Sequence, residues 1–231
     1  MTIDRRIRPL PTGIATSARA AIIATAVASL LLTGCFTGER PSFDDEGANR
    51  AGTSTGSPDI DAVAERLDEV AGATFTATFV IETKFGSLTS TGTVVQTSDG
   101  QRTVTVERPA ATTRYSILDG DEQTCNVLTG ECESALNDAR ISDVGIPHTF
   151  YGPSFATRLR VSADRRIGES SAYTSPIAGR DARCVDVQVA GGTETFCSLD
   201  SGVLARFIGN DVTVELTSYS PDADPAMLAA T

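Results

Sequence analysis

The side chains best suited to chemistry in this sequence are its cysteines, its single histidine and its single lysine. A Ser-His-Asp or Cys-His mechanism would have to use His148, and no G-x-S-x-G nucleophile motif is present. We interpret His148 as an exposed loop residue. Lys84 falls on the polar side of an amphipathic strand, where a solvated amine is expected. The sequence therefore predicts a protein that is not an enzyme.

Cys35 is the cysteine with the most informative surroundings. It ends a Leu32-Thr33-Gly34-Cys35 stretch that resembles the bacterial lipobox, which is an aliphatic residue, two small residues and a cysteine. The resemblance implies that the Cys35 thiol accepts a diacylglyceryl group and that cleavage before Cys35 makes it the first residue. Stable anchoring needs two or more acyl chains. An ordinary secretory signal with a coincidental cysteine is the alternative.

The segment before Cys35 has the layout of a signal peptide. Arg5, Arg6 and Arg8 precede an apolar core at about 20–32, which is too short for a comfortable membrane span. We assign 1–34 to a lipoprotein signal peptide. Residues 35–57 are the lipidated cysteine and a tether, which we expect to be disordered because Gly, Ser, Thr, Asp and Pro dominate it. Residues 58–220 form a single domain, and 221–231 a frayed tail.

Lipidation of Cys35 leaves four cysteines, which can form two local disulfides. Cys125 and Cys132 would face each other across a hairpin turn. Cys184 and Cys197 would do the same, in a register that places Val185 opposite Phe196 on the other face. An oxidising extracytoplasmic compartment would permit both bridges. A zinc site is the weaker alternative, because the spacings contain no CxxC pair.

The period of apolar residues predicts the elements that position these cysteines. A helix is expected at 58–71, with Ser57 as its N-cap and Pro58 in the first helical position. Strands are expected at 73–85, 89–97, 102–108 and 113–118, and again at 167–178, 182–189, 193–199, 203–208 and 212–219. Between the two runs, 135–140 and 155–161 could be short helices. The fold class is α+β, with a large antiparallel sheet.

The layout of lipobox, tether, first helix, meander, mid-chain helical excursion and closing strands resembles the LolA/LolB lipoprotein-carrier superfamily, and more closely its actinobacterial lipoprotein relatives. The stretch 179–207, with its cysteine pair around a glycine turn, is similar to a hairpin of those relatives. The resemblance implies a curved half-barrel sheet, with the N-terminal helix and the helical insert packed on one face. It also implies carriage of a lipid or another apolar ligand between sheet and helices.

Carriage requires an apolar concave face that the protein does not fill itself. The alternative is that the same residues form an ordinary packed core. The candidates for the ligand face lie on the predicted strands: Phe75, Phe79, Ile81, Val94, Val104, Val106, Ile117, Val185, Val187 and Phe196.

The charge balance limits the partners. The whole chain carries a formal net charge of -11, and the part after residue 34 is three charges more negative. This balance argues against nucleic acid and against a basic face on anionic lipids. We expect a membrane contact through the lipid anchor on the extracytoplasmic side of the cell membrane, and no cofactor or metal. A weak calcium site at Asp119, Asp121 and Glu122 lacks the loop motif of such sites.

Two functions fit these expectations. The first is a lipoprotein that binds or carries a lipid or another apolar ligand. The second is a non-enzymatic accessory or structural lipoprotein that contacts another envelope protein. An unfilled apolar cavity would favour carriage, whereas a solid core with an exposed apolar patch would favour the accessory role.

Overall fold

The computed structural model of the chain describes residues 54–139 and 146–228. The signal segment, the Leu32–Cys35 motif and most of the tether therefore lie outside the described residues. Within the two described ranges, no helix is both long and apolar enough to cross a membrane.

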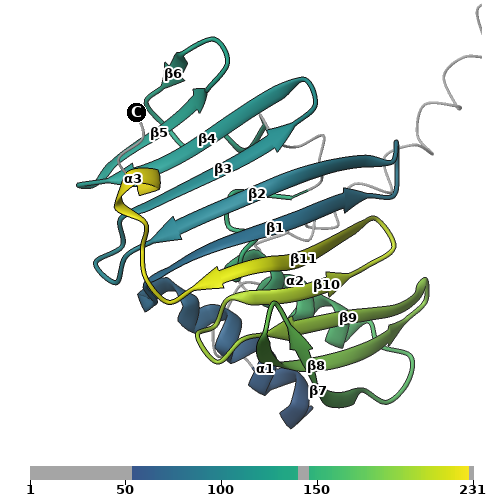
Figure 1. Cartoon of the computed structure of the whole chain (residues 1–231). Helices are drawn as coiled ribbons and strands as arrows, with labels where there is room; N and C mark the ends of the chain where they lie inside the picture. Colours follow the sequence, from purple (N-terminus) through teal and green to yellow (C-terminus); the bar gives the residue numbers. More distant parts are fainter. Residues whose placement is uncertain (1–53, 140–145, 229–231) are drawn as a thin grey trace, which may run out of the picture. The chain divides into compact units, whose positions relative to one another are not determined.

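The described chain is built around one open antiparallel sheet of eleven strands (Figure 1). Its spatial order is β6-β5-β4-β3-β2-β1-β11-β10-β9-β8-β7, so the first and last strands pair in the middle. The α+β class and the large antiparallel sheet are confirmed, and the sheet does not close into a barrel. The strands are β1 Phe75–Thr83, β2 Leu88–Gln96, β3 Arg102–Arg108, β4 Ala111–Leu118, β5 Asp121–Asn126, β6 Glu131–Glu133, β7 Ser171–Ile177, β8 Arg180–Val189, β9 Gly192–Ser198, β10 Leu204–Ile208 and β11 Val212–Ser220.

The helix α1 (Pro58–Glu69) begins where the sequence predicts, and its last turn tightens into a 3-10 segment, η2 (Val70–Gly72). The side chain of Ser57 makes no capping hydrogen bond. Instead, the carboxylate of Asp61 accepts hydrogen bonds from Ser54 and Thr55. Burial opposes ionisation of Asp61, but these hydrogen bonds hold its pKa below the usual value. Residues 54–57 are thereby tied to the first turn of α1.

The second helix, α2 (Pro153–Asp164), contains the predicted helical stretch 155–161 and packs beside α1. Both helices contact β8 and β9 on one face of the sheet, as expected. The prediction of another helix at 135–140 is wrong for residues 135–137, which are not helical. There, the Thr124 hydroxyl donates to the Ala135 carbonyl and accepts from the Asn137 N–H, so side-chain hydrogen bonds replace helical ones.

Both expected disulfides are present in the structure. Cys125 pairs with Cys132 between β5 and β6, and Cys184 pairs with Cys197 between β8 and β9. Val185 lies opposite Phe196, which confirms the register derived from the cysteine spacing. The two bridges fit an extracytoplasmic location.

The chain end folds back over the other face of the sheet. The expected frayed tail contains the one-turn helix α3 (Pro225–Leu228), which contacts β2 and β3. Asp224 N–H donates to the Thr76 hydroxyl, and the Thr103 hydroxyl donates to the Leu228 carbonyl. Thr76 and Thr103 alternate with the apolar core residues of their strands, so α3 lies on the face opposite α1 and α2.

Candidate functional site

The apolar inner face of the sheet, proposed from the sequence as a ligand face, is packed with protein side chains. Nine of its ten candidate residues are at most 1% exposed and belong to one continuous core. The tenth, Ile117, is half-buried and lines a surface pocket near Asp119. A ligand face at these residues stays a prediction, since a ligand would have to displace the side chains that now cover them.

The cover differs between the two halves of the sheet. Helices α1 and α2 lie on the half formed by β7–β11, where the ring of Phe207 packs at a tilt between those of Phe155 and Phe196. Over β1–β5, the cover comes from the irregular segment Ile146–Gly152, which we name the aromatic plug. Its Phe150 meets Phe79 edge-on, with ring centroids 5.1 Å apart.

The aromatic plug is also held by polar contacts. The buried Tyr151 hydroxyl donates to Gln96 Oε1 at 3.2 Å and contacts the Arg102 guanidinium. Burial raises the pKa of Tyr151, although Arg102 acts in the opposite direction. The Gln96 amide in turn donates to the carbonyl of Val70 at the end of α1. One hydrogen-bonded chain therefore connects α1, β2, β3 and the plug.

His148 lies in the aromatic plug, and its interpretation as an exposed residue is wrong. Its ring stacks on Tyr115, and its Nδ1 lies 2.8 Å from Asp138 Oδ1. The side chain is 16% exposed because these two residues enclose it. These two contacts of His148 could not be predicted from the sequence, because Tyr115 lies on β4 and Asp138 lies in another loop.

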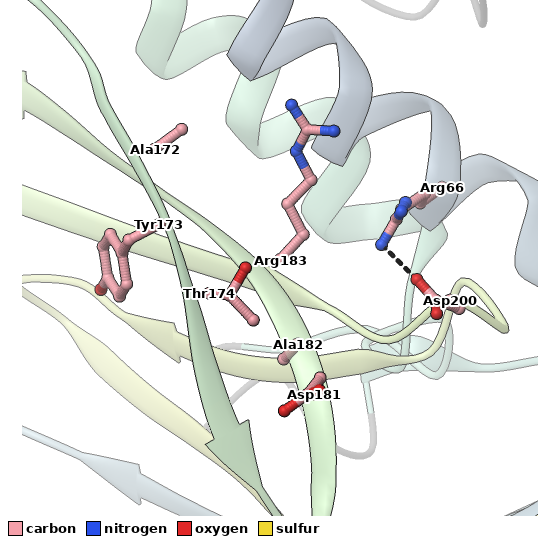
Figure 2. Close-up of a pocket in the computed structure, with 8 residues that line it drawn as sticks. All are labelled: Arg66, Ala172, Tyr173, Thr174, Asp181, Ala182, Arg183 and Asp200. Carbon is pink, nitrogen blue, oxygen red and sulfur yellow. Dashed lines mark ion pairs between the residues drawn. The ribbon is translucent and has the colours of Figure 1, made fainter.

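A second candidate site is a cleft of about 400 Å³ between α1 and the edge of the sheet at β7 and β8 (Figure 2). Two arginines face it from opposite walls. Arg66 of α1 pairs with Asp200 at 2.6 Å, and Arg183 of β8 pairs with Asp59 at 3.2 Å. The cleft is lined by Arg66, Ala172, Tyr173, Thr174, Asp181, Ala182, Arg183 and Asp200.

The side chains that line this cleft are suited to binding a ligand. All four charged groups of the two ion pairs are at least 30% exposed, so each pair contributes little to stability. A guanidinium has five N–H donors, and one carboxylate leaves several of them available to a ligand. The lining contains no histidine or cysteine. Tyr173 points away from the arginines in Figure 2 and donates to Asp186 on the other face.

The outer edge of β7, which pairs with no other strand of the described residues, forms one wall of the cleft. The Cα atoms of Cys184 and Cys197 are only 4.0 Å apart, the spacing of a non-hydrogen-bonded pair. The N–H and C=O of Cys184 therefore point to its partner Tyr173 on β7. By alternation, the backbone groups of Ala172 and Thr174 point away from the sheet. Pro176 has the same orientation, which is where a strand tolerates a missing N–H.

Other chemistry expected or considered from the sequence has no counterpart in this part of the chain. Asp119, Asp121 and Glu122 are exposed, and residues 54–139 and 146–228 contain no group of three acidic, cysteine or histidine residues that could hold a metal ion. The cleft could not be predicted from the sequence, because Arg66 and Arg183 are far apart in the chain and no motif joins them.

Comparisons with known proteins give distant structural similarities. No protein-family model and no curated protein matches the sequence. A crystal structure of MucB is 19% identical over 76% of this chain and 64% of that chain, with a TM-score of 0.48. The complex of MucA and MucB from Pseudomonas aeruginosa is 20% identical over 74% and 61%, with a TM-score of 0.45. The chain thus spans less than two thirds of these MucB chains.

A third solved structure has a lower sequence identity and a lower TM-score. It is a DUF1329 family protein from Desulfovibrio piger, which is 11% identical over 75% of this chain and 95% of that chain, with a TM-score of 0.29.

The contact between the aromatic plug and β2 gives a stability prediction. A Cβ added at Gly92 would lie 2.6 Å from Cζ of Phe150 and 3.1 Å from Cδ1 of Ile81. We expect Gly92→Ala to lower the free energy of unfolding by about 1–3 kcal/mol, the usual cost of overpacking a core. The control is Gly72→Ala, where an added Cβ meets no atom within 4 Å. Denaturant unfolding measures both; equal stabilities would contradict a rigidly seated plug.

Proposed function

We propose that the chain is a lipid-anchored extracytoplasmic protein that acts without catalysis, by binding an extended segment of another envelope protein along the free edge of β7. The observation that carries the proposal is the outward orientation of the Ala172 and Thr174 backbone beside a cleft with two half-buried arginines. The anchor rests on the Leu32–Cys35 motif of the sequence.

Strand addition suits this edge for three reasons. Edge strands leave unpaired N–H and C=O groups that a second chain can pair with. The side chains of Ala172 and Thr174 are small and exposed, so they leave room for an added strand. Alternate side chains of that strand would fall into the cleft, where Arg66 and Arg183 can bind a carboxylate or an amide oxygen.

The packed core supports a surface role in preference to an interior one. Carriage in the present conformation would need an apolar space that the protein leaves open. Instead, Phe150, Phe155 and Phe207 fill the inner face against the strands. The surface cleft, by contrast, is open without any rearrangement.

The proposed lipid anchor predicts in which cell fraction the protein is found. With Cys35 acylated, the protein should sediment with membranes and dissolve only in detergent, and Cys35→Ala should release it or leave its signal segment uncut. Fractionation and the intact mass of the detergent-extracted protein measure this. A wild-type chain that carries no acyl mass would contradict the anchor.

The edge prediction uses a matched pair of variants at one position. Thr174→Pro removes an N–H that points away from the sheet, so the fold should tolerate it as it tolerates Pro176. Thr174→Val keeps that N–H. We expect Thr174→Pro to lose crosslinking to the envelope partner that wild type and Thr174→Val retain, with a photoreactive group placed at Ser175. Equal crosslinking by all three chains would reject binding at this edge.

Carriage of an apolar ligand remains a second candidate, because one observation favours it. The inner face over β1–β5 is covered by the aromatic plug and not by a helix, and displacing a loop segment requires less rearrangement than displacing a packed helix. A ligand would then replace Phe150 and Tyr151 against the sheet.

Native mass spectrometry separates these two functions. Residues 36–231, exported into an oxidising compartment of a lipid-rich host, would be weighed in the native state and after denaturation. The edge-binding function predicts a native mass equal to the chain with two disulfides and no added ligand. Extra mass that is lost on denaturation and extracts as lipid would establish carriage instead.

A further inference from the structure

Exposed apolar side chains gather at one end of the sheet. Strand directions place the turns β1–β2, β3–β4, β5–β6, β8–β9 and β10–β11 at the same end, which runs from the β5–β6 turn at the top of Figure 1 to the β8–β9 turn at its right. Among the described residues, seven large apolar side chains are exposed, and five of them lie at this end. They are Phe85 (82% exposed), Ile167 (71%), Leu128 (67%), Val127 (38%) and Ile208 (38%).

The tether joins the domain at this same end. The Ser57 hydroxyl lies 3.1 Å from that of Ser170, just before β7 begins, and Arg166 donates to the Thr55 carbonyl. Ile167, which follows Arg166, is fixed by a backbone hydrogen bond to Gln188 at the end of β8. We name the five exposed apolar residues together with Lys84, Arg165 and Arg166 the tether-end surface.

The two ends of the sheet differ in charge. At the tether end the exposed charges are mixed: the cations are Lys84, Arg165 and Arg166, and the carboxylates are Glu82, Glu107, Glu131, Asp164 and Glu169. Asp211, in the β10–β11 turn, is bound by Arg158. The opposite end is more strongly acidic: its exposed carboxylates outnumber its exposed cation, Arg180, and are Asp99, Asp119, Asp121, Glu122, Asp181, Asp200 and Asp222.

From this asymmetry we infer that the tether-end surface lies against the lipid bilayer that holds the anchor, with Phe85, Leu128 and Ile167 in the interfacial region. The inference rests on the proposed anchor at Cys35. The first described residues, 54–57, lie at the apolar end, so an anchor that precedes them in the chain is joined to the domain there. Aromatic and aliphatic side chains with adjacent cations suit this interface.

The acidic end of the sheet favours the same orientation of the domain, because it is the end that an anionic membrane repels. Membrane surfaces that contain anionic lipids repel carboxylates and attract lysine and arginine over short distances. An acidic chain held close to such a surface is therefore most stable with its acidic end directed away from the lipid. The free edge of β7 runs between the two ends and stays accessible in this orientation.

A single reporter tryptophan tests the orientation, since the chain has no tryptophan of its own. Phe85→Trp places it at the tether end, and Met227→Trp is the matched control in α3, on an exposed residue at the other end. The chain from Cys35 onward would be coupled through the Cys35 thiol to a maleimide lipid in vesicles of phosphatidylcholine and phosphatidylglycerol with brominated acyl chains. The other four cysteines are in disulfides and do not compete.

We expect the Phe85→Trp emission to shift to the blue and to lose most of its intensity to the bromines, and the Met227→Trp emission to remain that of an exposed indole. Ile167→Trp gives an independent reporter if Phe85→Trp fails to fold. Equal emission from both ends would overturn the inference and leave the surface to a protein partner. Chemical coupling replaces acylation, so this outcome is distinct from a failure of the anchor in cells.

Discussion

An open eleven-stranded sheet with one apolar face must have that face covered, and the rest of this structure depends on how the cover is made. Two helices are too few to cover eleven strands. Helices α1 and α2 bury the half around β8 and β9, and the aromatic plug buries the other half with Phe150 and Tyr151. Because protein side chains cover nearly all of this face, the open binding surfaces are found at the edges and ends of the sheet.

Charged and polar side chains keep the cover in register with the sheet. Arg158 of α2 binds Asp211 in the β10–β11 turn and Glu194 on β9, and it lies over the ring of Phe207. Burial opposes ionisation of Asp211, but Arg158 holds its pKa below the usual value. Stabilisation from a lowered pKa is present above the unfolded-state pKa and is lost as the pH falls through the folded-state value. Acid therefore weakens the attachment of α2.

The two surfaces that remain differ in kind and serve compatible purposes. The edge of β7 offers backbone hydrogen bonds, which suit an extended protein segment. The tether-end surface offers exposed apolar side chains around Phe85 and Ile167, which suit a lipid interface. A lipid anchor at Cys35 would bring the second surface to the membrane and leave the first free for a partner.

The sequence by itself determined the elements whose signals are local. The alternation of apolar residues predicted most strands, and the helical spacing after Pro58 predicted α1. The spacing of each cysteine pair around a turn predicted both disulfides. The tertiary structure alone decided the pairing of β1 with β11, the packing of Phe150 against Gly92 and the burial of His148 by Tyr115. It also decided which residues meet in the β7 cleft. These features depend on contacts between residues distant in the chain, whose energies a local pattern does not contain. The helix expected at 135–140 was wrong over 135–137 for the same reason, because the hydroxyl of Thr124, on β5, bonds the backbone of Ala135 and Asn137.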